Sequence, residues 1–338
     1  MTFRYRIYGL DLFSDSPIPG LYEEREGSSC AGLSVELSGE PQWVRDGLRL
    51  PSVILQSLPA ISETQDPAFI LTSFGEGRFF QLAYSDGACF FVNDAATRIW
   101  GTAGESLTME DLSTYFLGPI MGFILRKRGT TALHASAVCI DEKAVVLTGE
   151  AGAGKSTTAA ALALHGAPVL CEDIAAVEEN GANFNIELGY PRVCLWPSAV
   201  EMLMGTADAL PRLTPNWDKC YLPLQGATAR FDERKRLLGA VYILAARETS
   251  AGAPRMEDVS NREVLLDLVQ NTYMNWLLDR RQRAAEFELL AQIVSRVPVR
   301  RIVPHRDPAR LDALCDLIVA DARRVMANPL SIAHSVGL

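Results

Sequence analysis

One glycine-rich segment, Gly149 to Ser156, constrains the fold of this chain more than any other part of the sequence. It reads GEAGAGKS, follows the short apolar run 144–148, and precedes a stretch rich in Ala, Thr and Leu that stops at Gly166. A strand, a glycine-rich turn and a helix in this order aim successive backbone N–H groups and the positive end of the helix dipole at one point, which suits phosphate groups. The sequence therefore predicts a phosphate-binding loop (P-loop) within an α/β domain.

The loop supplies side chains as well as backbone groups. Lys155 is expected to bring a mobile cation to the β- and γ-phosphates, from a position that faces solvent when no ligand is bound. Ser156 is expected to ligate magnesium. The predicted nucleotide-binding residues are Gly149, Glu150, Ala151, Gly152, Ala153, Gly154, Lys155, Ser156 and Thr157.

An acidic pair ends the next apolar strand. The run 168–171 is followed by Glu172 and Asp173, and doubly wound α/β folds place their ligands at the carboxyl ends of strands. P-loop proteins commonly keep a carboxylate near the metal at this place. Both residues are therefore candidate metal ligands, together with Ser156, and candidate catalytic groups. The alternative interpretation is a pair of ordinary solvated loop residues.

Two further residues are weaker candidates for catalysis. His134 lies just before the strand that leads toward the loop, and a lone histidine is more often a structural residue. Arg192, in the segment GYPRVCLWP, either helps to neutralise a transferring phosphate or lies on the surface. Asp218-Lys219 and the run 305–307 are interpreted as solvated loops unless they face the P-loop.

The first third of the chain has a different pattern. Residues 1–128 contain alternating and aromatic-rich stretches divided by Pro-Gly, Ser-Gly and Asp-Gly turns, which is typical of a mainly antiparallel β module. A closing helix is expected across Met109 to Lys127. The sequence of this module has no clustered His, Cys or carboxylate set, so it is interpreted as a structural or substrate-docking part.

After residue 128 the pattern changes to buried strands alternating with helices, and predicts a second domain over 129–327 with a tail at 328–338. The remaining expected elements are strands at 135–140, 237–246 and 299–303, one or two helices within 262–294, and a helix at 308–327. No internal repeat is present in the sequence.

Charge and cysteine content narrow the classes of partner. The formal net charge is -9 with 22% charged residues, so the chain lacks the positive charge that non-specific nucleic-acid binding requires. Its seven cysteines are single and form no CxxC pair, which indicates a reducing compartment. The charged N-terminus lacks the apolar stretch of a signal peptide or membrane span. We therefore expect a cytoplasmic protein that binds neither nucleic acid nor membrane.

The stretch from His134 to Val177 resembles the HPr kinase/phosphorylase family and its HPr-kinase-related relatives. A histidine precedes the strand, GEAGAGKST forms the loop, an alanine-rich helix ends in LHG, and the next strand ends in CED. The family pattern at this spacing is a GxSGxGKS loop and an Asp-Asp pair, and Glu172 replaces the first aspartate here. The resemblance implies an α/β fold in which a P-loop kinase domain of the HPr kinase/phosphoenolpyruvate carboxykinase-like type follows an N-terminal mainly β module.

The resemblance also implies roles for single residues. Asp173 matches the base that faces the acceptor hydroxyl, and His134 matches the active-site histidine of the family. Lys155 matches the phosphate ligand and Ser156 the magnesium ligand. The family's signature with a second metal-ligating glutamate is not evident, and GYPRVCLWP stands in that region instead. The phosphorylase half of the family's reaction is therefore not implied.

The GYPR and LWP pattern and the opening YRIYGLDLFSDSPIPGL resemble HPr-kinase-related proteins encoded beside peptide-maturation genes, including lasso-peptide kinases that phosphorylate a precursor's terminal serine. This resemblance implies an ATP- and Mg²⁺-dependent kinase that phosphorylates a serine on a protein or peptide. The wider family contains homo-oligomers, but its oligomeric state does not transfer automatically to a chain with this different N-terminal module, so a homo-oligomer stays open. A nucleotide-responsive regulatory or binding module without phosphoryl transfer, a small-molecule kinase acting on free serine, and GTP in place of ATP stay open as alternatives.

Overall fold

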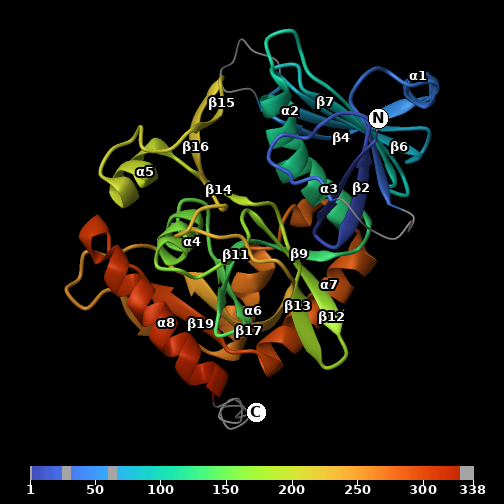
Figure 1. Ribbon diagram of the computed structural model, residues 1–338. Helices are drawn as coiled ribbons and strands as arrows, with labels where there is room; N and C mark the ends of the chain where they lie inside the picture. The colour runs from blue at the N-terminus through green and yellow to red at the C-terminus, as the bar shows by residue number, and fades with distance from the viewer. Residues whose placement is uncertain (1, 25–31, 60–66, 328–338) are drawn as a thin grey trace. The chain divides into compact units, whose positions relative to one another are not determined.

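The computed structural model describes residues 2–24, 32–59 and 67–327, and within these ranges the chain is a mixed α/β protein with three sheets (Figure 1). Two compact units divide it: Met1–Arg128 with Leu213–Trp217, and Gly129–Arg212 with Asp218–Leu338. The expected catalytic segment 129–327 thus contains a short stretch, 213–217, that belongs to the first unit. The expected tail at 328–338 and Cys30 lie outside the described residues.

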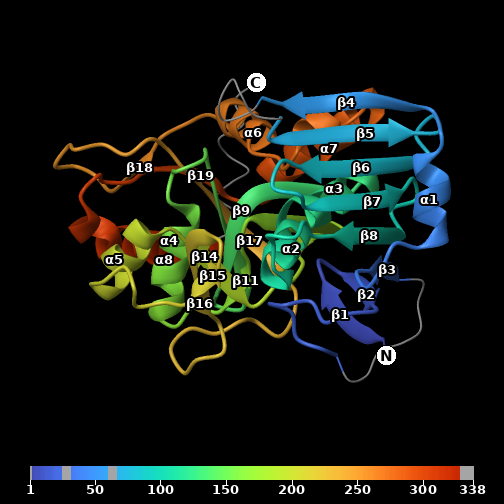
Figure 2. The ribbon, with the colours of Figure 1, turned by 90° about the horizontal axis from the view of Figure 1, so that it is seen from above.

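The first unit is built on an eight-stranded sheet in the order β1-β2-β3-β8-β7-β6-β5-β4. Its strands are β1 (Phe3–Ile7), β2 (Leu10–Ser14), β3 (Leu33–Glu36), β4 (Ser52–Leu58), β5 (Phe69–Phe74), β6 (Phe79–Tyr84), β7 (Cys89–Asn93) and β8 (Arg98–Thr102). Strands β4 to β8 lie side by side as antiparallel neighbours (Figure 2). Because only β3 pairs in parallel, with β2 and β8, the sheet is mainly antiparallel, as the sequence predicts.

Helices cover parts of this sheet. They are α1 (Gln42–Leu48), α2 (Met109–Tyr115), the π-helical turn η1 (Phe116–Ile120) and α3 (Met121–Lys127). A capping box between Thr108 and Asp111 begins α2, which satisfies the first free N–H groups of the helix. Pro119 inside η1 has no N–H to donate, so the helical hydrogen-bond ladder widens there. The expected helix over 109–127 is confirmed, with this interruption.

The second unit contains a mixed sheet in the order β10-β9-β12-β13-β17-β19-β18, with β11 beside β9 and a further pairing between β10 and β17. Its strands are β9 (Thr131–Ile140), β10 (Lys143–Thr148), β11 (Val169–Cys171), β12 (Ile174–Asn180), β13 (Asn183–Ile186), β17 (Arg236–Leu244), β18 (Arg255–Glu257) and β19 (Val299–Val303). A small sheet in the order β14-β16-β15 is formed by β14 (Arg192–Leu195), β15 (Arg212–Thr214) and β16 (Trp217–Pro223).

The position of β9 sets this unit apart from a simple doubly wound sheet. It is antiparallel to both β10 and β11, so the strand before the P-loop and the strand before the acidic pair run in the same direction with β9 between them. The other edge of β10 pairs in parallel with β17, and β17 in turn pairs in parallel with β19. The carboxyl ends of β10, β11, β17 and β19 therefore point the same way.

The helices of the second unit are α4 (Lys155–Leu164), α5 (Pro197–Met204), α6 (Asn261–Gln270), η2 (Asn275–Leu277), α7 (Arg280–Arg296), η3 (Pro308–Arg310) and α8 (Leu311–Ala327). Helix α4 packs against β9, β10, β14 and α8 (Figure 1). Its run Ala159–Ala163 is buried, because small side chains let the helix approach the sheet closely. In the described part of the chain, no helix has both the length and the apolar character needed to cross a membrane.

Candidate functional site

The P-loop joins the end of β10 to the start of α4 and fits closely against the end of β17. Gly149 has a φ of 141° and Gly154 a φ of 105°, in the region that favours glycine. A Cβ on Gly149 would lie 2.5 Å from the carbonyl oxygen of Leu244, and one on Gly154 would lie 2.6 Å from Nη2 of Arg247. Both positions therefore require glycine.

Lys155 is buried, with 7% of its surface exposed, so the expectation that it faces solvent without a ligand is wrong. Its Nζ donates hydrogen bonds to the carbonyl oxygens of Gly149 at 2.8 Å and Glu150 at 3.1 Å. Burial lowers the pKa of Lys155, although Asp173 and Glu172 nearby act to raise it. The loop's own carbonyls thus fix the ammonium group at the start of α4.

Glu172 is buried beside the first turn of α4. It is 3% exposed, and it accepts hydrogen bonds from the hydroxyl of Ser156 at 2.7 Å and that of Tyr190 at 3.3 Å. Burial raises the pKa of Glu172, and the neighbouring Lys219 opposes this shift. Glu172 is therefore not a solvated loop residue.

Asp173 adopts a left-handed backbone conformation, with a φ of 67°. Such a conformation is uncommon outside glycine and often marks a functional position. Its Oδ1 lies 3.5 Å from Nε2 of His134, and its Oδ2 accepts a hydrogen bond from the hydroxyl of Tyr273 at 3.2 Å. The carboxylate is thus held between an imidazole and a phenol.

His134 is fixed through its backbone in the middle of the sheet. Its N–H donates to the carbonyl oxygen of Asn271 at 2.8 Å, and its own carbonyl accepts from the hydroxyl of Thr148 at 3.1 Å. Burial lowers the pKa of His134, Asp173 acts to raise it, and Lys155 lowers it further. Because the shift is downward from 6.5, the imidazole is neutral at pH 7.

One cavity of about 330 Å³, which we call the carboxylate cavity, collects these groups. His134, Glu172 and Asp173 line it, as do the loop residues Ala151, Gly152, Gly154, Lys155, Ser156 and Thr157. Three cationic side chains, of Lys155, Lys219 and Arg247, stand among the two carboxylates in its wall. This balance suits a phosphate polyanion that arrives with a divalent cation.

Four of the predicted site residues do not line the carboxylate cavity. Arg192 is buried in β14, with its guanidinium 5.3 Å from the centroid of the Tyr190 ring, and it does not line the cavity. Gly149, Glu150 and Ala153 line a second cavity next to the loop, which we call the flanking cavity.

Magnesium fits the arrangement as an ion that binds together with phosphate. Among the residues that the structure describes, no three His, Cys, Asp or Glu side chains gather into a metal site. Mg²⁺ commonly takes only one or two protein carboxylates and completes its shell with water and phosphate oxygens. The Ser156 hydroxyl and Glu172 carboxylate, 2.7 Å apart, offer that partial set.

Sequence reasoning missed two cations of the carboxylate cavity. Lys219 was interpreted as part of a solvated loop, yet it lines the cavity from β16. Burial acts to lower the pKa of Lys219, but Glu172 nearby raises it and the net shift is upward. Asp173 is predicted as a site residue because it is a polar residue just past a buried strand. Arg247 lies just past β17, so the same rule identifies it. Arg306, in the run 305–307, lines the flanking cavity.

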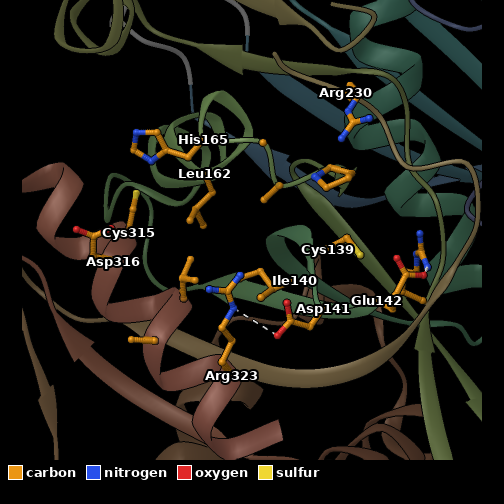
Figure 3. A pocket seen from close by; sticks show the side chains of 16 residues that line it. Cys139, Ile140, Asp141, Glu142, Leu162, His165, Arg230, Cys315, Asp316 and Arg323 are labelled. Atoms are coloured by element: carbon orange, nitrogen blue, oxygen red, sulfur yellow. Dashed lines mark hydrogen bonds and ion pairs between the residues drawn. The ribbon is translucent and has the colours of Figure 1, made fainter. Parts of the chain in front are cut away.

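The largest of the cavities described here is distant from the P-loop end of β10. It measures about 760 Å³ and is lined by the turn between β9 and β10, with residues of α4 and α8 (Figure 3). Arg323 pairs with Asp141 at 3.4 Å, and Arg236 pairs with Glu142. Since its lining includes none of the predicted site residues, this cavity is separate from the candidate site.

Comparison with known proteins gives likenesses to solved structures but no family. No protein-family model and no curated protein matches the chain. Among solved structures, the chain is similar to the Hpr(Ser) kinase/phosphatase from Coxiella burnetii, with a TM-score of 0.32 and 16% sequence identity. The likeness covers 61% of this chain and 99% of that chain. The residues of the site, and not this likeness, support the function proposed below.

Proposed function

We propose that this chain is a kinase that transfers the γ-phosphoryl group of ATP, bound with Mg²⁺, to a serine hydroxyl on a protein or peptide. One observation carries the proposal: a single cavity contains the P-loop lysine, the Ser156-Glu172 pair and the Asp173 carboxylate. We further propose that the second unit is a P-loop kinase domain of the HPr kinase/phosphoenolpyruvate carboxykinase-like type.

The first task of such an enzyme is to hold and neutralise the phosphates. Loop N–H groups and the start of α4 would bind the β-phosphate, and Lys155 would exchange the carbonyls of Gly149 and Glu150 for phosphate oxygens. Lys219 and Arg247 add positive charge around the transferring group. Mg²⁺, held by Ser156 and Glu172, would neutralise charge on the phosphates.

The second task is to accept the proton of the attacking hydroxyl. Asp173 is the proposed base, because its carboxylate lines the cavity and is oriented by Tyr273. His134 lies 3.5 Å from the Asp173 carboxylate and is neutral, so the two side chains do not form a full ion pair. A serine that approaches Asp173 would be positioned in line with the γ-phosphate on the loop.

Two observations favour this function over the alternatives. A nucleotide-binding module needs the loop and the metal but no base, whereas here Asp173 is kept in a left-handed conformation with two side-chain neighbours. A kinase that acts on free serine would need no exposed apolar side chain to contact its substrate. Here Trp196, in the wall of the carboxylate cavity, is 62% exposed. An exposed indole suits a side chain next to the serine of a peptide.

A transfer assay tests the proposal. The purified protein is incubated with Mg-ATP and the peptide encoded beside its gene, a lasso-type precursor being the first candidate, and phosphoserine is located by mass spectrometry. The same peptide with alanine at the acceptor position is the control, and free serine is a competing acceptor. Phosphoserine only on the intact peptide supports the proposal. Binding of Mg-ATP with no transfer to peptide or free serine would show a binding module instead.

A further inference from the structure

Strand β4 is the last strand of the eight-stranded sheet in the first unit (Figure 2). In the part of the chain that the structure describes, it pairs with β5 alone. Alternate N–H and C=O groups on its other edge therefore point away from the sheet, where another extended backbone can pair with them. β4 contributes no residue to the carboxylate cavity or the flanking cavity, so the proposed function does not use this edge.

Both faces of β4 carry apolar side chains that are exposed. Four of its side chains are large, apolar and between 47% and 61% exposed: Val53, Ile54, Leu55 and Leu58. Leu58 lies opposite Phe69 of β5, which is buried. Because opposite residues of paired strands share a face, the buried face of the sheet continues onto β4 and becomes exposed there. Ile54 lies opposite Thr72, on the other face. Exposed apolar side chains gathered in this way mark an interaction surface.

The edge lacks the charged side chains that commonly protect an edge strand from pairing. From Leu50 to Pro59 the sequence contains no charged residue, although the whole chain has a formal net charge of -9. Pro51 and Pro59 stand just outside the seven-residue strand, and because proline has no N–H to donate, they limit its length. A charged strand placed here would lose hydration without gaining an opposite charge. The edge therefore suits an uncharged strand of about the same length.

Two features favour a peptide over a second copy of this chain as the occupant. A stable interface between folded proteins has about 20–30 residues on each side, whereas β4 offers seven. The pairing with β5 also shifts register between Ile54 and Gln56, and such a bulge bends the strand. A flexible peptide can follow this bend, whereas two bent edges on folded sheets pair over fewer residues.

We infer that β4 binds an extended, uncharged peptide segment as an added strand of the sheet, an interaction that goes beyond the proposed function. Backbone hydrogen bonds to the free edge supply the affinity of such a complex, and side chains at alternate positions supply its specificity. Apolar side chains of the peptide would contact Val53 and Leu58 on one face and Ile54 on the other.

A binding assay without nucleotide tests the inference. The probe is a fluorescein-labelled, end-blocked peptide of seven alternating valine and threonine residues, and its binding is measured by fluorescence anisotropy. Val53→Lys and Ile54→Lys place a charge on each face of the edge. Phe287→Lys, at an exposed apolar residue of α7 in the second unit, is the matched control. A second probe has the same side chains but carries N-methyl groups on its backbone nitrogens, so it cannot donate strand hydrogen bonds.

Both β4 variants are expected to bind the first probe at least ~10-fold more weakly, while Phe287→Lys stays within about twofold of the unaltered protein. The N-methylated probe is expected to bind the unaltered protein at least ~10-fold more weakly than the first probe. Hydrogen exchange of the β4 amides, followed by mass spectrometry, should slow with the first probe only. Circular dichroism confirms that the variants fold.

Absence of binding by the first probe, or equal binding by the N-methylated probe, would overturn the inference. An equal loss of affinity in Phe287→Lys would overturn it as well. Self-association of the unaltered protein in sedimentation velocity, if Ile54→Lys abolishes it, would assign the edge to a second copy instead. Because no nucleotide is present, each of these results leaves the proposed function to its own transfer assay.

Discussion

The hydroxyl of Tyr273 donates a hydrogen bond to Oδ2 of Asp173 at 3.2 Å, although 100 residues of sequence separate them. The Tyr273 backbone N–H donates to the carbonyl of Ala132 at 2.8 Å, and its ring meets the His134 ring edge-on with centroids 5.8 Å apart. The segment after α6 is therefore fastened to β9, and the phenol can orient the carboxylate without touching a substrate.

Tyr273→Phe removes only this hydroxyl. The loss of one hydrogen bond to a charged group, worth about 1.5–3 kcal/mol in a protein, should lower kcat for phosphoryl transfer by ~10-fold, with little change in KM for ATP. Steady-state kinetics at saturating acceptor measure both constants. Tyr22→Phe, a change in the first unit, is the control, and an equal fall in kcat there would contradict a positioning role for Tyr273.

Asp173→Asn keeps the size of the side chain but removes its ability to accept a proton. Phosphoryl transfer should fall by ~10²-fold or more, whereas the affinity for Mg-ATP should change much less. Asp312→Asn, at a side chain that is 81% exposed, is the control. If Asp173 is mainly a metal ligand, nucleotide affinity falls together with the rate and added Mg²⁺ restores part of both. Full activity in Asp173→Asn would show that another carboxylate is the catalytic base.

Glu172→Gln should separate stability from function. A buried carboxyl whose pKa is raised above its ordinary value of 4.5 stabilises the fold while protonated, and this stability is lost as the pH rises through the raised pKa. The glutamine variant has no such loss, so its melting temperature without Mg²⁺ should exceed that of the unaltered protein by a margin that grows as the pH rises above 4.5. Its affinity for Mg²⁺-ATP should fall about 10-fold or more.

Thermal melts at a series of pH values above 4.5, with and without Mg²⁺, measure the first effect, and calorimetry measures the second. Glu201→Gln, an exposed position on α5, should show neither. A glutamine variant that is less stable than the unaltered protein at pH 8 would mean that Lys219 stabilises the ionised carboxylate more than burial destabilises it.

Lys155→Ala should abolish nucleotide turnover. The variant also loses the two hydrogen bonds from Nζ to the loop carbonyls, so a stability cost of about 1–3 kcal/mol is expected. Lys143→Ala is a matched control. Lys143 is a half-buried lysine that also donates to a carbonyl, and it lies at the start of β10, the end away from the P-loop. Turnover is measured as release of ADP, and circular dichroism confirms that both variants fold. Unchanged turnover in Lys155→Ala would refute the P-loop assignment.

The elements around the P-loop follow from local sequence patterns. A buried strand, three loop glycines and an alanine-rich helix lie next to one another in the chain, so the sequence predicts β10, the loop and α4 nearly to the residue. The strand predicted at 299–303 is likewise confirmed as β19. Short-range periodicity and turn residues carry these predictions.

Features that depend on distant pairings could not be predicted in this way. Nothing in the local pattern of β9 indicates that it separates β10 from β11, because strand order is decided by contacts across the whole unit. The same holds for Lys219 and Arg247, which reach the cavity from β16 and from the end of β17. The burial of Lys155 also depends on tertiary packing, since the loop lies against the end of β17.

The pairing of the strands also has a consequence for the order in which the site can form. His134, Lys155, Glu172 and Asp173 all lie within one continuous stretch, in which β9 pairs with β10, β11 and β12. Arg247 lines both cavities and follows β17, which must find β10 from far along the chain, with Ala144 beside Leu238. Because closing a long loop costs more entropy and takes longer, a growing chain would bring His134 and the two carboxylates together first. It would complete both cavities only after β17 has been synthesised.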